Sequence, residues 1–272
     1  MNVTIPEKYK MKKKTIAIYV VIAIICVLSI IVVVEAQVLG NDIVNQLFGI
    51  NKLVKRSEEE EAKLKDNFEN VIDNTEEGIE DNLIYKIYEK QEIANNSEID
   101  VSLPYININN SEAKKFNNEI ISVFAKKAEI IINNEVENTI YTVKYKATVE
   151  NNILSLIIYS DLKQGTNPQR IIVQTFNYDL EEGKALTFEE VAEKYKYDLS
   201  EIQSKITTDI EEEQSKSNDL AELGYNVFSR DLNDEMYKTE YISEFFIYNN
   251  NIYIIFAYGN NQMTSEMDLV II

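Results

Sequence analysis

Histidine and tryptophan are absent from the 272-residue sequence, and there is one cysteine. Without histidine the chain cannot build a Ser-His-Asp triad, histidine-based acid–base catalysis or the usual zinc sites. The cysteine, Cys26, lies inside a long apolar run, which excludes an intrachain disulfide and thiol catalysis. Neither a G-x-x-x-x-G-K-S/T phosphate loop nor a G-x-G-x-x-G dinucleotide loop is present. Among the common catalytic side chains, carboxylates remain.

The carboxylates are arranged in runs and in first helical turns. Glu58–Glu61 and Glu211–Glu213 are typical of solvated faces, and Glu189, Glu190 and Glu193 fall where acidic side chains complement a helix dipole. We therefore expect no catalytic, cofactor-binding or metal-binding residue. The sequence predicts a protein that is not an enzyme and needs no cofactor.

Positive charge is scarce outside the first residues. The chain has 46 Asp and Glu against 27 Lys and Arg, and residues 1–14 hold five of the lysines but one glutamate. Residues 35–272 consequently carry a net charge of −23. This charge argues against binding to nucleic acid or to anionic membrane surfaces. It is compatible with a basic protein partner, although solubility is a simpler explanation.

Residues 15–34 contain no charged side chain. About 20 apolar residues span roughly the 30 Å hydrocarbon core of a bilayer. The lysines that precede this run should stay on the cytoplasmic side by the positive-inside rule. We therefore expect a cytoplasmic tail (1–14), a transmembrane helix (15–34) and an extracytoplasmic remainder in the cell membrane. The alternative is a signal peptide cleaved near Val34-Glu35-Ala36, but signal peptides usually have a shorter apolar core.

Residues 35–82 are predicted to form a helical, polar stalk. Apolar residues recur at helical spacing on both sides of a polar stretch, K-R-S-E-E-E-E-A-K-L-K. They are Ile43, Leu47, Ile50 and Val54 before it, and Leu64, Phe68, Val71 and Ile72 at its end and beyond. A dimeric coiled coil is the alternative, but the apolar positions are not sustained over several heptads.

From residue 83 the pattern changes to short strands and helices, which predicts an α+β domain over 83–272. Alternating runs predict strands at 83–89, 98–108, 141–149 and 170–180, and 153–162 is apolar on both faces, as in a central strand. Pro104 favours an edge position for its strand. A helix is predicted at 111–132 from its apolar stripe. Short turns connect the strands predicted at 141–149, 153–162 and 170–180, which predicts an antiparallel meander.

The second half of this domain shows turn and capping signals. Glu182-Gly183 predicts a turn, and Thr187 with Glu190 has capping-box spacing for a following helix. A second helix is expected from Leu199 onward, then a hairpin at 245–258 around asparagines and a final strand at 267–272. Antiparallel sheets with packed helices are therefore expected. The order is compatible with two sub-modules, 83–180 and 181–272.

Candidate ligand-facing residues lie in the polar loop Y-G-N-N-Q-M-T-S-E-M-D at 258–268, because loops carry function more often than the strands beside them. The candidates are Tyr258, Asn260, Asn261 and Glu266. Four of the 17 tyrosines lie on predicted strands, namely Tyr141, Tyr145, Tyr253 and Tyr258. They could line a binding surface. Packing in the core is the interpretation that we favour for them.

Several motifs occur together in a familiar order. They are S-L-P-Y-I-N at 102–107, F-N-N-E-I at 116–120, N-N-I-L-S-L at 151–156, T-F-N-Y-D-L-E-E-G-K-A-L-T-F-E-E-V at 175–191 and F-F-I-Y-N-N-N-I-Y-I-I-F at 245–256. This order resembles the extracytoplasmic domain shared by RsiV-type anti-sigma factors and the N-terminal part of PdaC-type peptidoglycan deacetylases. The resemblance covers residues 83–272. It implies an α+β domain outside the membrane that binds a ligand without transforming it, and family members include a receptor for lysozyme.

The chain departs from the anti-sigma pattern at its cytoplasmic end. The 14 residues before the apolar run are fewer than the 20–30 residues per partner that a stable interface typically needs, and we expect no deacetylase domain. We therefore expect a non-enzymatic, membrane-anchored module that binds a cell-envelope glycan or protein. The alternative is an RsiV-like receptor or anti-sigma-type signalling protein that senses a basic protein such as lysozyme. The abundance of Asn, Ile and Lys is typical of an AT-rich genome, as in low-GC Gram-positive bacteria.

Overall fold

The structure is a computed structural model that describes most of the chain after residue 52. The described residues are 53, 56–73, 82–94, 97–133, 138–167, 169–225, 227–258 and 266–272. The tail and the transmembrane helix that we predict at 1–14 and 15–34 lie outside these ranges. Within these ranges, no helix has both the length and the apolar character needed to cross a membrane.

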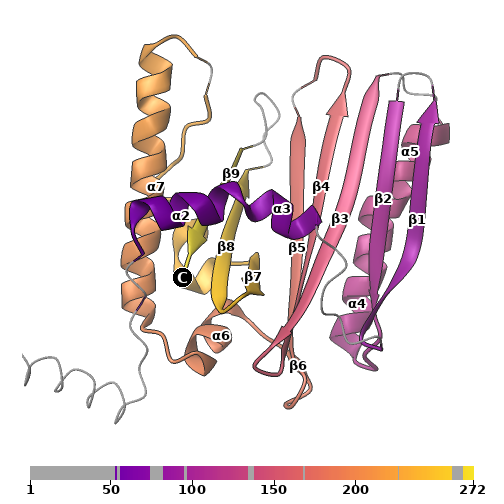
Figure 1. The fold of residues 1–272 in the computed structure, drawn as a ribbon, viewed down its shortest axis with the longest axis horizontal. Coiled ribbons are helices and arrows are strands. Elements are labelled where there is room, and N and C mark those ends of the chain that lie inside the picture. The colour runs from indigo at the N-terminus through magenta and orange to yellow at the C-terminus, as the bar shows by residue number, and fades with distance from the viewer. Residues whose placement is uncertain are drawn as a thin grey trace, which may run out of the picture. The chain divides into compact units, whose positions relative to one another are not determined.

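A six-stranded sheet forms the larger half of the fold (Figure 1). Its strands are β1 (Ile84–Ala94), β2 (Ser97–Ile106), β3 (Thr139–Glu150), β4 (Ile153–Gln164), β5 (Arg170–Asp179) and β6 (Lys184–Ala185), in that spatial order. The predicted meander is confirmed, because β3, β4 and β5 pair in an antiparallel manner through short turns. β2 and β3 pair in parallel, which the sequence analysis did not predict. A parallel pair needs a long crossover connection, and the helical segment between these strands provides it.

That crossover is the predicted helix at 111–132, which the structure confirms with one irregularity. It consists of α4 (Ser111–Ile120), a π-helical turn η2 (Ile121–Ala125) and α5 (Lys126–Asn133). The apolar residues that predicted the helix are all buried, namely Ala113, Phe116, Ile120, Phe124, Ala128 and Ile131. They pack on one face of the six-stranded sheet, against β2 residues such as Val101 and β3 residues such as Val143.

Pro104 does not lie on the edge strand. β2 is flanked by β1 and β3, so β1 occupies the edge of the sheet. The pairing of β2 with β3 nevertheless ends at Val101, and Pro104 lies opposite Lys86 beside a bulge in β1. Proline is therefore accommodated where the ladder is already interrupted.

A three-stranded antiparallel sheet forms the other half, with β7 (Phe245–Tyr248), β8 (Asn251–Tyr258) and β9 (Glu266–Ile271) in that order. The predicted hairpin is confirmed. Asn249 and Asn250 form its turn with φ of 51° and 60°, in the left-handed region that asparagine tolerates better than most residues. Asn151 and Asn152 make a similar turn between β3 and β4.

Helices cover one face of this smaller sheet. α6 (Phe188–Lys194) begins with the predicted capping box between Thr187 and Glu190, and α7 (Leu199–Glu222) follows. The short turns η3 (Glu235–Tyr237) and η4 (Thr239–Tyr241) complete this layer. Phe188 from α6, Ile206 from α7 and Ile254 from β8 belong to one buried apolar cluster.

The end of the segment that we predicted as a stalk packs onto both sheets. It forms α2 (Glu58–Asp66) and α3 (Phe68–Asp73), which cross in front of the strands in Figure 1. Phe68 and Ile72 are fully buried in a cluster with Ile157 from the larger sheet and Tyr253 from the smaller one. Residues 58–73 are therefore part of the folded body, because their apolar stripe has a protein surface to cover.

Buried polar side chains join the two sheets along the free edge of β7. The Asn177 amide donates to the carbonyl of Phe245 at 2.9 Å, and the Ser155 hydroxyl donates to the Asn177 side-chain oxygen at 2.6 Å. The N–H of Ile247 donates to Ser155 Oγ at 2.9 Å, and Thr148 Oγ1 donates to the carbonyl of Ile247 at 2.6 Å. These side chains supply the hydrogen-bond partners that another strand would otherwise provide.

Candidate functional site

The structure places the four predicted ligand-facing residues in different circumstances. Tyr258 ends β8 and is buried, with 7% of its surface exposed. Glu266 begins β9 opposite Tyr258, and the structure describes its backbone but not its side chain. Asn260 and Asn261 lie outside the described residues, so their ligand-facing role stays a prediction.

The hydroxyl of Tyr258 takes part in a buried polar cluster. It donates to Asp268 Oδ2 at 2.7 Å and lies 2.8 Å from the hydroxyl of Tyr237. Since the single Tyr258 proton goes to the carboxylate, Tyr237 is the donor of the second bond. Burial and the negative charge of Asp268 raise the pKa of Tyr258. This phenol is therefore held neutral, and its polar tip is turned inward.

Arg230 is the cation of the same cluster. Its Nε and Nη2 atoms donate to the two carboxylate oxygens of Asp268 at 2.5 and 2.7 Å, a bidentate geometry. Its Nη1 atom donates to Ser217 Oγ at 2.6 Å, which connects α7 to β9. Arg230 and Asp268 are both nearly inaccessible, at 7% and 6% exposure. Such a cluster joins α7, β8 and β9 and is a structural clamp.

Sequence reasoning missed this clamp, although one signal was available. The chain has three arginines against 24 lysines, and Arg is the side chain suited to a buried, bidentate contact with a carboxylate. Arg56 also contacts β9, but its Nη1 atom donates to a backbone carbonyl, that of Ile271, at 3.1 Å.

The acidic runs that we assigned to solvated faces are partly engaged. Lys205 on α7 donates to Glu61 on α2 at 2.9 Å and to Asp209 at 3.0 Å. Burial raises the pKa of Asp209 to about 6, against the opposing effect of Lys205. Glu61 therefore helps to fix α2 on α7, whereas Glu58 and Glu59 remain exposed.

The other strand tyrosines that we singled out are part of the core, as the favoured interpretation predicted. Tyr141 and Tyr145 are buried under α4 and α5, and Tyr253 is buried beneath α3. Their rings are not available to a ligand.

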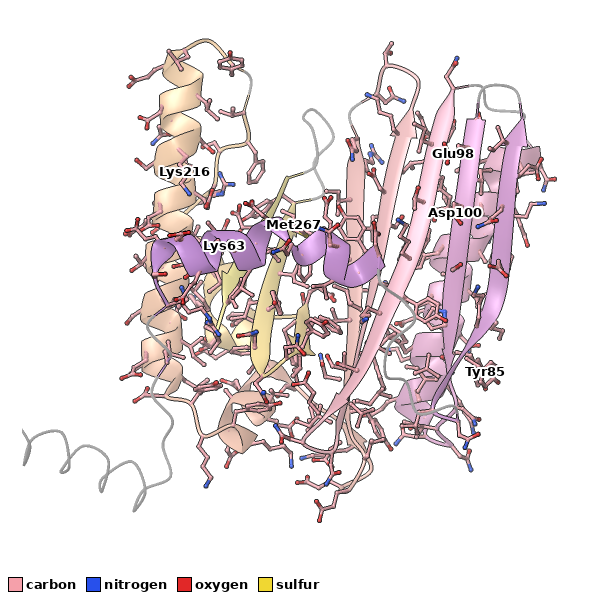
Figure 2. All side chains as sticks on the ribbon, in the orientation of Figure 1. Lys63, Tyr85, Glu98, Asp100, Lys216 and Met267 are labelled. Atoms are coloured by element: carbon pink, nitrogen blue, oxygen red, sulfur yellow. The ribbon has the colours of Figure 1, made fainter. Side chains whose placement is uncertain are left out.

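A better candidate is the face of the larger sheet at β1, β2 and β3 that no described helix covers. Two cross-strand rows lie on this face, one exposed and one half-exposed at Asp100 and Thr142, while the alternate β2 residues Ile99 and Val101 point to the helices on the opposite face. The rows are Ile93–Glu98–Ile140 and Gln91–Asp100–Thr142. We call these six residues the open face. Figure 2 shows Glu98 and Asp100 on the side of the sheet away from α4 and α5.

The open face combines apolar and acidic groups. Ile93 and Ile140 flank Glu98 and are 83% and 49% exposed. Neither Glu98 nor Asp100 forms an ion pair with any residue that the structure describes; Asp100 accepts one hydrogen bond, from Gln91 at 3.2 Å. Exposed isoleucines beside unneutralised carboxylates suit a partner with apolar groups and positive charge.

An aromatic pair lies farther along the same two strands. The rings of Tyr85 and Tyr105 stack at 4.8 Å between centroids, and Tyr85 is 46% exposed at the outer edge of β1 (Figure 2). Tyrosine provides apolar area with a polar tip, as binding surfaces often do. Within the described ranges, no group of acidic or cysteine side chains is arranged to hold a metal ion. The chemistry available at the open face is contact and charge.

The sequence matches no protein-family model, and no curated protein matches it. Among solved structures, a DUF3298 family protein from Pseudomonas aeruginosa PAO1 is similar with a TM-score of 0.38 and 11% identity, over 70% of this chain and 91% of that one. A DUF3298 family member from Bacteroides fragilis NCTC 9343 has a TM-score of 0.36 and 10% identity, over 69% and 89%. Neither description names an RsiV-type or PdaC-type protein, so that resemblance stays a prediction from the motifs.

Proposed function

We propose that the chain is a non-enzymatic, membrane-anchored module whose domain lies outside the cytoplasm and binds a cell-envelope glycan or protein. The proposal takes the span at 15–34 as the anchor and the open face as the binding surface. The observation that carries it is the open face itself, where exposed isoleucines flank Glu98 and where neither Glu98 nor Asp100 forms an ion pair with a described residue. A solvated sheet face without a ligand would be expected to carry scattered polar residues.

A basic protein, such as lysozyme, is the second candidate for the ligand. The net charge of −23 over residues 35–272 supports it, because complementary charge accelerates encounter and selects partners. The uncovered, two-row geometry also supports it. Protein partners dock on broad surfaces, whereas small ligands usually need a concave site.

A binding comparison separates the two ligands. Full-length chain in non-ionic detergent is titrated with lysozyme and, separately, sedimented with insoluble peptidoglycan. Reversal of both charges in a Glu98→Lys, Asp100→Lys variant should weaken lysozyme binding by tenfold or more, about 1.4 kcal/mol, and reduce its salt dependence. If peptidoglycan is the ligand, the original chain sediments with peptidoglycan and does not bind lysozyme.

The matched control places the same two reversals on α7, as Glu211→Lys, Glu212→Lys. These side chains are exposed, and α7 lies at the opposite end of the fold from β1 in Figure 1. Equal loss in both variants would show that only net charge matters and would refute the open face as the site. Release of muropeptides by the original chain would refute the non-enzymatic part. Protection of the domain from protease on intact cells would refute its location.

A further inference from the structure

Among the described residues, no strand pairs with the outer edge of β5 between Ile171 and Gln174. β6 pairs with Tyr178 and Asp179 alone. Nearer the middle of β5, the N–H of Leu186 donates to the Asn177 carbonyl at 2.8 Å, and the N–H of Thr175 donates to the carboxylate of Glu244 at 2.6 Å. In an antiparallel strand, every second residue directs its N–H and C=O to the same side. The backbone groups of Ile171 and Val173 therefore point to this edge as well.

A hollow of about 290 Å³ lies at this free edge. One wall is formed by Ile171 to Val173 of β5, and the other by Ile255 to Ala257 of β8 and by Met236. The β8 wall also has free backbone groups. β7 begins opposite Ile254, and among the described residues one further backbone bond on that side runs from the N–H of Ile255 to the carbonyl of Glu244 at 3.0 Å. By the same alternation, Ala257 directs its N–H and C=O into the hollow.

Glu244 lines the hollow with its carboxylate. Its Oε2 atom accepts from both the N–H and the hydroxyl of Thr175, at 2.6 and 2.9 Å. Among the described residues, no lysine or arginine pairs with it, and no hydrogen bond reaches its Oε1 atom. Burial raises the pKa of Glu244 to about 7. The hollow thus contains an acidic group that has no cationic partner among the described residues.

We propose that this hollow binds an extended peptide segment of a partner protein, which adds to the free edge of β5 and places a lysine ammonium group against Glu244. Backbone donors and acceptors at strand spacing recognise another extended backbone, as in β-strand addition. The apolar side chains of Ile171, Val173 and Ile255 accept alternate side chains of the segment. The carboxylate then selects a cation, because an uncompensated charge in an apolar setting gains most from a direct partner.

Peptide titration of the full-length chain in detergent tests this proposal. The probe is a fluorescein-labelled, N-terminally acetylated peptide of alternating valine and threonine with one central lysine. Two matched peptides replace the lysine with glutamate or carry N-methyl groups on alternate backbone nitrogens. We expect the lysine peptide to bind and both matched peptides to bind at least tenfold more weakly. No binding by the lysine peptide, or equal binding by all three, would overturn the proposal.

Protein variants locate the site. Glu244→Gln keeps an oxygen acceptor for Thr175 and should weaken binding of the lysine peptide about tenfold, about 1.4 kcal/mol. Asp161→Asn is the matched control, because Asp161 is also a half-buried carboxylate with a raised pKa but does not line the hollow. The open-face variant Glu98→Lys, Asp100→Lys should bind the peptide normally, so the two proposals can fail separately. An unchanged affinity in Glu244→Gln, with an unchanged melting temperature, would refute the role of Glu244.

Discussion

Replacement of Phe68 by alanine tests whether α3 is part of the folded body. Phe68 is fully buried, and its ring lies 5.2 Å from the ring of Tyr253. A buried Phe→Ala change typically costs about 3–5 kcal/mol, from lost transfer energy and the cavity that remains. The loss of stability has an upper limit, because the N-terminal segment that contains α2 and α3 can detach from the two sheets. It cannot exceed the free energy with which α2 and α3 dock.

That limit can be approximated from the buried side chains. Phe68 and Ile72 are the fully buried residues of α3, and each contributes about 1.5–3 kcal/mol on burial. The docking energy is then about 3–6 kcal/mol, with a small addition from the Lys205–Glu61 ion pair. We expect Phe68→Ala to lower the free energy of unfolding by about 3 kcal/mol and to leave α2 and α3 largely undocked.

Urea unfolding and hydrogen exchange together measure this effect. The unfolding midpoint should fall, and the slope should fall with it, because an undocked segment leaves less surface to expose. Amides of α2 and α3 should lose protection while those of β4 keep theirs. Glu69→Ala, on the exposed face of α3, is the control and should change stability by less than about 0.5 kcal/mol. Equal effects of the two substitutions would mean that α3 is not docked, and the stalk prediction would stand for this segment.

Three further outcomes are expected. Asp268→Asn leaves Arg230 buried without its counter-charge and should cost about 3–5 kcal/mol in urea unfolding, whereas the double variant Asp268→Leu, Arg230→Met should cost less than the single one. Burial raises the pKa of Glu244 from 4.5 to about 7. The stability that protonated Glu244 contributes is therefore complete below pH 4.5 and is lost as the pH rises through 7. Glu244→Gln should flatten the stability–pH curve in that window, by at most about 3 kcal/mol; an unchanged slope would refute this. Gly183→Ala should lower the free energy of unfolding by about 1 kcal/mol, because Gly183 has φ +72°. Steric contact adds little to this cost, since an added Cβ would meet only the Tyr178 hydroxyl at 3.7 Å. A neutral result would show that the turn can relax.

The features that could be predicted from the sequence depend on residues that are close together in the chain. The Thr187–Glu190 capping box, the Asn249–Asn250 turn and the apolar stripe of α4 and α5 each depend on neighbours within one or two turns. Local hydrogen bonding and side-chain period determine such features almost alone. They were sufficient to predict the antiparallel strands and the α+β class.

Features set by distant partners could not be read in the same way. The apolar spacing of Phe68 and Ile72 is the same for a helix on a protein surface as for a stalk, and only the two sheets decide between them. Tyr258 showed that a strand-end tyrosine beside a polar loop can turn inward, because Arg230 and Asp268 supply a buried network for its hydroxyl. The open face was missed because exposure of Ile93 and Ile140 follows from where the helices lie.

The contacts between the two sheets are relevant to whether the domain divides at residue 180 into two sub-modules, as the order of its elements suggested. β7 has four residues and one strand neighbour, and a sheet of this size is marginal by itself. Its other edge is completed by side chains of the larger sheet, including Asn177 and Ser155, which are themselves buried and would be left without partners if the sheets separated. An unsatisfied buried polar group costs about 1–3 kcal/mol, so each half imposes a penalty on the other when they part. α3 adds to this dependence, because Phe68 and Ile72 contact both sheets. The described body from α2 to β9 is therefore best understood as one cooperative unit, which keeps the open face and the hollow at Glu244 in fixed positions on a common scaffold.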